Sequence, residues 1–238
     1  MQNKYYKILF LCLGISSGIG AQTYKHTTLW SRLAFQKEIK SWEFKLEFDY
    51  RQQNDFTKSL NNPIQKPLMR WVRTYTTYNS GRFSHTLILP NYIKSYRLVG
   101  TKSDLNIPNS YEWRYSFFEE YGLPYKKSTT SLRAGYEYRS ISSDNISRRA
   151  ARLRIRLSET IDFTEKSSLN MTFEPIYNIS PNKPPNSFSQ NQLALRYTHV
   201  FAGKINFTTG INHAFIKRNT LVEYDMANAI LCNFVIDI

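Results

Sequence analysis

The sequence predicts an all-β protein: an antiparallel up-and-down transmembrane β-barrel of about 10–12 strands. Three observations support this fold class. Large apolar and polar residues alternate along most of the chain, the polar positions carry arginines together with carboxylates, and short connections alternate with long ones. The mean hydropathy of −0.49 excludes a bundle of transmembrane helices, but it does not exclude a barrel, whose strands average an apolar and a polar face.

The clearest predicted strand is residues 42–51, which run from Trp42 to Arg51. Every even position is large and apolar or aromatic, and every odd position is charged. Successive side chains of a strand point to opposite faces, so this segment would have one apolar and one ionic face. A helix would scatter the same residues around its circumference.

Ten further segments are predicted as strands. They are residues 27–36, 69–78, 82–93, 111–118, 132–139, 151–158, 168–177, 193–198, 205–212 and 230–238. Most show the same alternation, 69–78 and 82–93 are strand-like by their Thr, Tyr and β-branched content, and 27–36 is a further candidate. The faces of 69–78 and 82–93 are harder to assign. Short connections are predicted near 37–40, 79–81, 122–127, 164–166 and 201–203, and longer ones near 52–68, 94–110, 140–148, 179–189 and 217–223. Short turns that alternate with long loops are typical of outer-membrane barrels, whose long loops are extracellular.

The first 21 residues have the features of a signal peptide. Lys4 and Lys7 precede a short apolar stretch, and small residues lead to a predicted cleavage site after Ala21. The domains are therefore residues 1–21, a signal peptide, and residues 22–238, an outer-membrane β-barrel. Removal of Lys4 and Lys7 would lower the formal net charge of +14 by two and leave a strongly basic exported chain.

Several of these segments resemble an uncharacterised family of small Gram-negative outer-membrane barrels that has no known function. The resemblance rests on short patterns along the whole mature chain: Leu29-Trp30, the Lys37–Lys40 hairpin, Trp42-Glu43-Phe44 to Tyr50-Arg51, Tyr111-Glu112-Trp113-Arg114, Arg133 to Arg139, and Arg152 to Arg156. It implies an outer-membrane location and a barrel fold. It implies no catalytic residue and no cofactor, because the family has no established activity.

The predicted strand count conflicts with an expected even number of strands. Eleven segments are predicted as strands, whereas bacterial single-chain barrels have even numbers of strands. If residues 42–238 close as ten strands, residues 27–36 are left over. That segment could plug the lumen, pair at the seam, or indicate a missed twelfth strand.

The polar faces predict a lumen lined by charge. Nine cations are assigned inward: Lys45, Arg51, Arg114, Arg133, Arg139, Arg152, Arg154, Arg156 and Arg196. Eight carboxylates accompany them: Glu43, Glu47, Asp49, Glu112, Glu120, Glu137, Glu174 and Asp237. A turn near 164–166 predicts that Arg156 lies opposite Glu174, Arg133 opposite Arg156, and Arg196 diagonal to Glu174. These pairs could satisfy one another and fill a narrow barrel, or line a passage for small anions.

Other cations are assigned to the outer loops, where the phosphates of lipopolysaccharide are the expected partner. The candidates are Lys94, Arg97, Arg148, Arg149, Lys217 and Arg218. The expected partners are therefore outer-membrane lipid, lipopolysaccharide and the barrel assembly machinery, which inserts exported barrels. Export makes nucleic acid an improbable partner, although the charge alone would favour it in a cytosolic chain.

The expected function is a structural or small-solute, porin-like role, without catalytic residues, cofactor or metal. An outer-membrane lipid-modifying enzyme is one alternative, but the sequence has no Gly-x-Ser-x-Gly motif and no pair of histidines at metal-ligand spacing among His26, His85, His199 and His213. A secreted β-sandwich binding domain is the other alternative, because the strands of a sandwich also alternate between apolar and polar residues.

Overall fold

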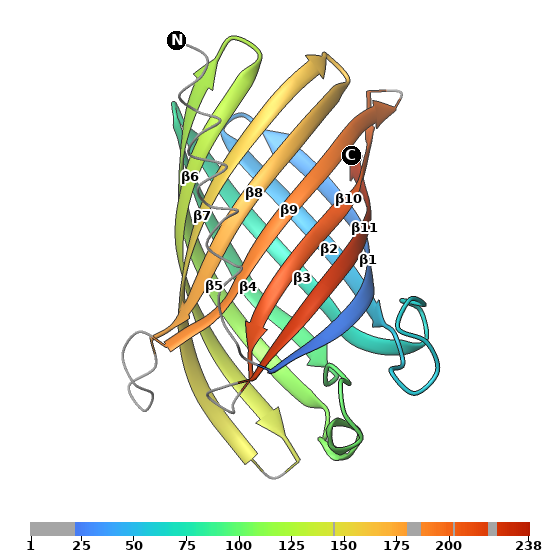
Figure 1. The fold of residues 1–238 in the computed structure, drawn as a ribbon. Coiled ribbons are helices and arrows are strands. Elements are labelled where there is room, and N and C mark those ends of the chain that lie inside the picture. Colours follow the sequence, from blue (N-terminus) through green and yellow to red (C-terminus); the bar gives the residue numbers. More distant parts are fainter. Residues whose placement is uncertain (1–21, 145, 180–186, 202, 219–222) are drawn as a thin grey trace.

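In the computed structural model, the alternating segments form eleven strands of a barrel (Figure 1). The structure describes residues 22–144, 146–179, 187–201, 203–218 and 223–238, so the predicted signal peptide lies outside the described residues. The strands are β1 (Gln22–Ile39), β2 (Trp42–Gln53), β3 (Lys66–Ser80), β4 (Phe83–Ser95), β5 (Ser110–Tyr125), β6 (Ser128–Ser143), β7 (Ile146–Thr164), β8 (Ser167–Asn178), β9 (Ser187–Phe201), β10 (Ile205–Lys217) and β11 (Glu223–Asp237). A short 3₁₀ helix, η2 (Ser103–Asn106), lies between β4 and β5.

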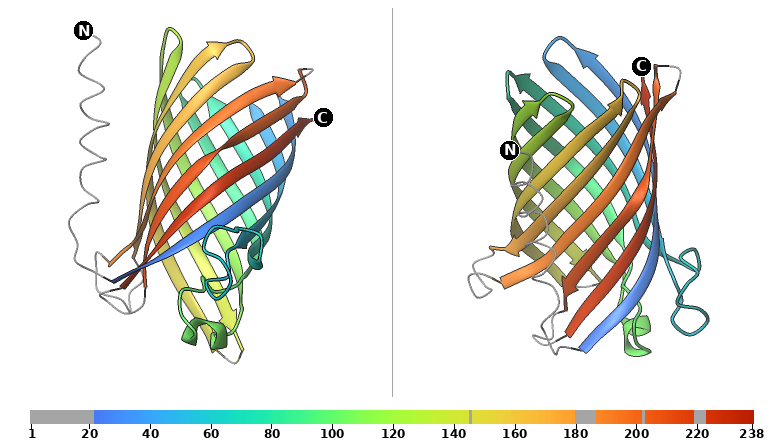
Figure 2. Two further views of the ribbon diagram at one scale, coloured as in Figure 1. Left: turned by 45° about the vertical axis from the view of Figure 1, so that its right-hand side comes forward. Right: turned by 45° about the horizontal axis from the view of Figure 1, so that its top comes forward.

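The barrel closes at β1, which corrects the expectation of an even strand number. β1 pairs antiparallel with β2 and parallel with β11, and every other neighbouring pair is antiparallel. Residues 27–36 therefore pair at the seam as part of an eleventh strand. Because the strand number is odd, Gln22 and Ile238 lie at opposite ends of the barrel, as both views in Figure 2 show.

The outer face of the barrel is apolar and its inner face is polar. On β2, the outward residues Trp42, Phe44, Leu46, Phe48 and Tyr50 are between 37% and 45% exposed. On the inner face of the same strand, Glu47 and Asp49 are buried. A β-sandwich in water would bury the apolar face between two sheets. The closed barrel with this polarity therefore rules out the β-sandwich alternative.

Pro90 explains why the faces of β4 do not follow one alternation in the sequence. The ladders on both sides of β4 shift register around Leu89 to Asn91. Proline has no N–H to donate to a neighbouring strand, so a bulge forms there. Outward positions are odd up to Leu89 and even from Tyr92 onward, which breaks the simple alternation.

The two ends of the barrel differ in their connections. Tight turns join β1–β2, β3–β4, β5–β6 and β7–β8 at one end, which we call the turn end. Residues 54–65 and 96–109 form long connections at the other end, the loop end (Figure 1). The expected long connection at 140–148 is wrong: β6 and β7 continue to Ser143 and from Ile146, and Asp144 adopts a positive φ of 47° in a tight turn. In the described part of the chain, no helix is long and apolar enough to span a membrane.

Candidate functional site

A continuous ladder of ion pairs lines the lumen along β5, β6, β7 and β8. Arg139 and Arg114 both donate to Glu112, with Nε–Oε1 distances of 2.6 Å and 2.7 Å. Arg114 continues to Glu137 through Nη1 at 3.5 Å, and Arg154 Nη1 donates to the same Glu137 oxygen at 3.0 Å. Each arginine thus joins two carboxylates or two strands, and the ladder crosses the lumen wall diagonally.

Glu174 on β8 is the most heavily contacted carboxylate of this ladder. Arg154 Nη2 and Arg156 Nη2 reach its Oε2 at 2.8 Å and 3.0 Å, and Arg133 Nη2 reaches its Oε1 at 3.4 Å. The register also places Arg133 directly opposite Arg156. The Glu174 side chain is only 3% exposed, so three guanidinium groups surround one carboxylate that has little access to water.

A second cluster lies on β1, β2 and β3. Arg32 bridges Glu47 and Asp49 at 3.2 Å and 3.1 Å, and Arg51 Nε donates to Asp49 Oδ1 at 3.0 Å. Arg73 also pairs with Glu47. The guanidinium of Arg51 lies between two indoles, 3.6 Å from the ring of Trp30 and 4.1 Å from that of Trp71. Stacking between aromatic faces holds an arginine in place without a second carboxylate.

The middle of the lumen therefore carries more positive than negative charge. Among the described residues, ten arginines face this belt: Arg32, Arg51, Arg73, Arg114, Arg133, Arg139, Arg152, Arg154, Arg156 and Arg196. Six carboxylates accompany them: Glu47, Asp49, Glu112, Glu120, Glu137 and Glu174. The sequence assigns nine cations and eight carboxylates to the whole interior. The belt has a larger excess of cations because Arg32 and Arg73 add to it, while Glu43 and Asp237 lie toward the turn end.

Two of these arginines have no ion pair within 4 Å among the described residues. Arg152 Nε donates to Asn178 Oδ1 at 3.3 Å, although Arg152 lies opposite Glu137 in the ladder. Arg196 Nη1 donates to Asn170 and Thr172 at 3.3 Å and 3.4 Å. The expected diagonal contact between Arg196 and Glu174 is wrong, because β9 pairs Arg196 with Asn170, four residues from Glu174.

An inward phenylalanine, Phe118, supports the arginine ladder. Its ring lies 4.5 Å from the guanidinium of Arg133 and 5.7 Å from that of Arg154. Phe118 faces Gly135 on β6, and a Cβ at Gly135 would lie 1.9 Å from the Phe118 ring. The glycine thus provides the space in which this ring can lie against the wall.

A polar cavity of about 290 Å³ lies in the lumen toward the turn end. Its lining includes Lys45, Glu43, Tyr75, Glu120 and Arg133. Lys45 and Glu43 form an ion pair at 3.1 Å. Arg133 therefore belongs both to this cavity and to the ladder around Glu174, so the cavity leads directly to the arginine belt.

At the loop end, residues 96–109 fold onto the barrel wall through Arg218. Its Nη1 and Nη2 reach Asp104 at 3.3 Å and 3.2 Å, and its Nε reaches Asp225 Oδ1 at 2.9 Å. His26 Nε2 lies 2.8 Å from the same Asp225 oxygen, and the Tyr24 ring lies 4.0 Å from the guanidinium. We call Asp104, Arg218 and Asp225 the loop latch, because they tie the β4–β5 loop to β11 and the end of β10.

The Asp104 carboxyl in the loop latch is held in its ionised form. Burial alone would raise its pKa, but hydrogen bonds from Thr101 and from the backbone of Gly100 and Thr101, together with Arg218, lower the pKa below its usual value. A lowered pKa in the folded state means that this contribution to stability is fully present above the ordinary aspartate pKa of about 3.9. It is lost only as the pH falls through the lowered value, so the Asp104 carboxyl stays ionised at neutral and mildly acidic pH.

Arg218→Met is expected to release the β4–β5 loop from the wall, since methionine keeps apolar bulk but removes both ion pairs. The loop carries Lys102, a trypsin site, and release should increase the rate of cleavage there. Limited proteolysis of the folded protein followed by mass spectrometry measures this rate. Lys217→Met is the matched control, because Lys217 makes no ion pair among the described residues. Equal cleavage of the Arg218 variant and the wild type would contradict the latch.

The cations that were assigned to lipopolysaccharide lie in different environments. Arg218 is only 8% exposed and belongs to the loop latch, so its assignment as a lipid-facing residue is wrong. Arg97 pairs with Asp104 at 3.6 Å. Arg148 and Arg149 are exposed but lie on β7 rather than in a loop, Lys217 is the last residue of β10, and Lys94 lies on the outer face of β4.

The histidines lie apart from one another. His26 belongs to the wall beside the loop latch, and His85 pairs with Glu119 at 2.5 Å near the turn end. His199 Nδ1 lies 2.9 Å from Ser167 Oγ on the outer wall, and His213 Nδ1 lies 2.8 Å from Asn228. No carboxylate pairs with His199 in the part of the chain that the structure describes, so the Ser167–His199 pair lacks the third group of a hydrolase triad.

Sequence reasoning missed Arg32, Arg73, Trp30 and Trp71 as lumen residues. The alternation of Trp71, Arg73 and Tyr75 on one face of β3 was a usable signal, because the outward positions of this strand stay even from Arg70 to Tyr78. Arg32 was missed because residues 27–36 had no assigned partner. Once β1 is paired with β2, Arg32 lies directly opposite Asp49.

Comparisons with known proteins give a family but no activity. No curated protein matches the chain. Two solved structures are similar: OmpT expressed in the outer membrane of Vibrio cholerae, at 10% identity and a TM-score of 0.40, and an anion-selective porin from Comamonas acidovorans, at 8% identity and a TM-score of 0.36. They cover 76% and 82% of this chain, which spans about half of theirs (54% and 52%). A family model described as "Protein of unknown function (DUF2490)" matches residues 27–225, and the chain belongs to that family.

Proposed function

We propose that the protein is an outer-membrane barrel whose arginine-rich lumen admits small anions. The observation that carries the proposal is the charge of the middle belt, where ten arginines face six carboxylates. Rings of arginine or lysine select anions in pores, and guanidinium groups bind oxyanions through two parallel hydrogen bonds. The location is supported by the outward apolar face, which suits lipid and not water.

The row Arg152, Arg154 and Arg156 provides successive anion positions along β7. The side chains of alternate residues lie about 6.6 Å apart along a strand, so three arginines cover about 13 Å of the lumen. Arg133 faces the last of them and also lines the turn-end cavity. An anion could therefore pass between the cavity and the belt by exchanging one guanidinium for the next.

Planar-bilayer recording under a potassium chloride gradient tests the proposal. Wild-type protein is expected to conduct, with a reversal potential whose sign shows preference for chloride. An Arg152→Gln and Arg196→Gln double variant should lower the chloride-to-potassium permeability ratio several-fold, because it removes the two arginines without ion pairs. Arg149→Gln is the control and should leave the ratio unchanged, because Arg149 is exposed and shares the outward phase of Ile155 and Leu157 on β7.

A second candidate is a purely structural barrel whose interior is closed by its own ion pairs. The observation that favours it is the burial of Glu112, Glu137 and Glu174, each only 2% exposed. The same recording separates the two functions. Absence of conductance above the lipid baseline, or preference for potassium, would contradict the anion passage, and absence of conductance would favour the structural role.

A further inference from the structure

We propose that the outer wall of the barrel binds one lipid A molecule, with a phosphate held between Arg70 and Lys94 and acyl chains in the groove beside them. This inference rests on the proposed placement in the outer membrane, but it concerns the exterior and not the lumen. It is carried by three observations: the position of the two cations, their lack of ion-pair partners, and an apolar groove that begins at the same level.

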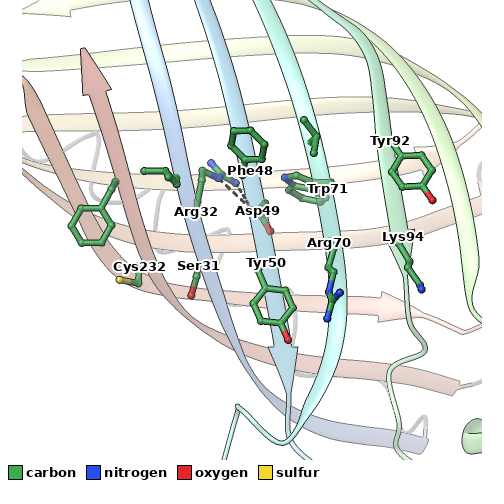
Figure 3. A pocket seen from close by; sticks show the side chains of 13 residues that line it. Ser31, Arg32, Phe48, Asp49, Tyr50, Arg70, Trp71, Tyr92, Lys94 and Cys232 are labelled. Atoms are coloured by element: carbon green, nitrogen blue, oxygen red, sulfur yellow. Dashed lines mark hydrogen bonds and ion pairs between the residues drawn. The ribbon is translucent and has the colours of Figure 1, made fainter. Parts of the chain in front are cut away.

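Arg70 and Lys94 belong to one row of outward residues that crosses the seam. The register joins Cys232 to Ser31, Ser31 to Tyr50, Tyr50 to Arg70 and Arg70 to Lys94 on the neighbouring strands β11, β1, β2, β3 and β4. Figure 3 shows these five side chains on successive strands. The row lies on the side of the groove nearer the loop end, since β1 begins at that end and Ser31 precedes Leu33.

Arg70 and Lys94 occupy directly opposite positions on β3 and β4 without a counter-charge. No described carboxylate forms an ion pair with either side chain, and their charged groups lie over aromatic rings instead: Arg70 at 5.1 Å from Tyr50, and Lys94 at 5.4 Å from both Tyr96 and Tyr111. Like charges at directly opposite positions of a sheet destabilise it. An anion bound between them would remove this repulsion and accept hydrogen bonds from both.

The groove next to the cations is apolar and has a volume of about 680 Å³. Its outward lining comes from the next row toward the turn end: Phe234, Leu33, Phe48, Val72 and Tyr92, which the register also places on five neighbouring strands. The small side chains of Ser31 and Cys232 leave space between the larger ones. A hydrocarbon chain would bury these apolar surfaces, whereas a free phosphate ion could not use them.

The chemistry of the site favours lipid A over a phospholipid. A barrel of this class has its long loops outside the cell, so the row of Arg70 and Lys94 faces the outer leaflet. Lipid A, the lipid of that leaflet, carries phosphates on a sugar backbone with several acyl chains. The wide groove spans five strands and has two cations at one edge, which matches a phosphorylated headgroup with several chains.

Native mass spectrometry of refolded, lipid-free protein in detergent, with bis-phosphorylated lipid A as the probe, tests the inference. Wild-type protein is expected to bind one lipid A, and Arg70→Gln with Lys94→Gln should weaken binding by about tenfold or more. Val72→Trp, which fills the groove without changing charge, should also weaken binding. Arg148→Gln with Arg149→Gln is the matched control, since it removes two exposed cations that do not line this groove.

Three outcomes would overturn the inference: undiminished binding by the Arg70/Lys94 variant, an equal loss in the Arg148/Arg149 control, or equal binding of phosphatidylglycerol. Monophosphoryl lipid A should bind more weakly than the bis-phosphorylated form. Bilayer recording on the Arg70/Lys94 and Val72 variants separates this inference from the proposed function, because these three residues lie in the outward phase of β3 and β4. Loss of lipid binding with unchanged anion selectivity is the expected combination.

Discussion

Replacing Glu174 with glutamine is expected to lower the free energy of unfolding by about 3–5 kcal/mol, the range found when one partner of a buried ion pair is removed. Glutamine keeps the shape of the side chain but removes the charge that Arg133, Arg154 and Arg156 share. The three arginine side chains are between 14% and 24% exposed, so water compensates their charges only in part. The remaining cations then repel one another.

Urea unfolding of the protein in lipid vesicles, followed by tryptophan fluorescence, measures this loss. Glu165→Gln is the matched control: Glu165 lies in the exposed turn between β7 and β8, where loss of charge should change stability by no more than about 0.5 kcal/mol. The double variant Glu174→Gln with Arg156→Gln should be more stable than Glu174→Gln alone, because it removes one of the unpaired cations. A double variant that is no more stable would argue against a charge imbalance as the cause.

Local alternation was sufficient to predict which residues face lipid and which face the lumen on most strands. On β2, the period of two from Trp42 to Arg51 extends without interruption, and the structure shows both faces as predicted. Alternation failed to predict the two faces where one residue interrupts the period of two along a strand. Pro90 cannot donate to a neighbouring strand, and its bulge changes the outward positions of β4 from odd to even.

The partner of a strand depends on the closure of the whole barrel and cannot be read from its own pattern. Residues 27–36 alternate like the other segments, yet nothing local indicates that β1 runs parallel to β11. The rule of even strand numbers describes barrels whose two termini lie at the same end. Here Gln22 and Ile238 lie at opposite ends, and an odd number of strands follows.

The residues of the candidate site also fall into two groups: those that local alternation could place and those that it could not. Arg114, Arg133 and Arg154 could be placed in the lumen because each lies in phase within a long, regular strand. Arg218 could not, because a loop cation in the sequence gives no sign of the Asp104 that reaches it from 114 residues away. Contacts that depend on how a loop folds back onto the wall require the three-dimensional structure.

A disulfide between β1 and β11 is expected to form when Ser31 is replaced with cysteine, because the parallel register places Ser31 directly opposite the native Cys232. Neighbouring strands lie about 4.8 Å apart, within the Cα separation that disulfides span. The bond would close a loop across almost the whole barrel. The chain-entropy model gives about 5 kcal/mol of stabilisation for a loop of about 200 residues.

Thiol alkylation and non-reducing electrophoresis of the unfolded protein detect this bond, since the cross-linked chain is more compact and migrates faster. Thr209→Cys is the positive control, because β10 places Thr209 opposite Cys232 in an ordinary antiparallel pair. Leu33→Cys is the negative control, because Leu33 lies opposite Phe234, two residues from Cys232. Efficient cross-linking from positions 31 and 209, but not 33, requires β1 to lie at the seam in the parallel register. A plug inside the lumen would give no cross-link from position 31, because Cys232 faces outward.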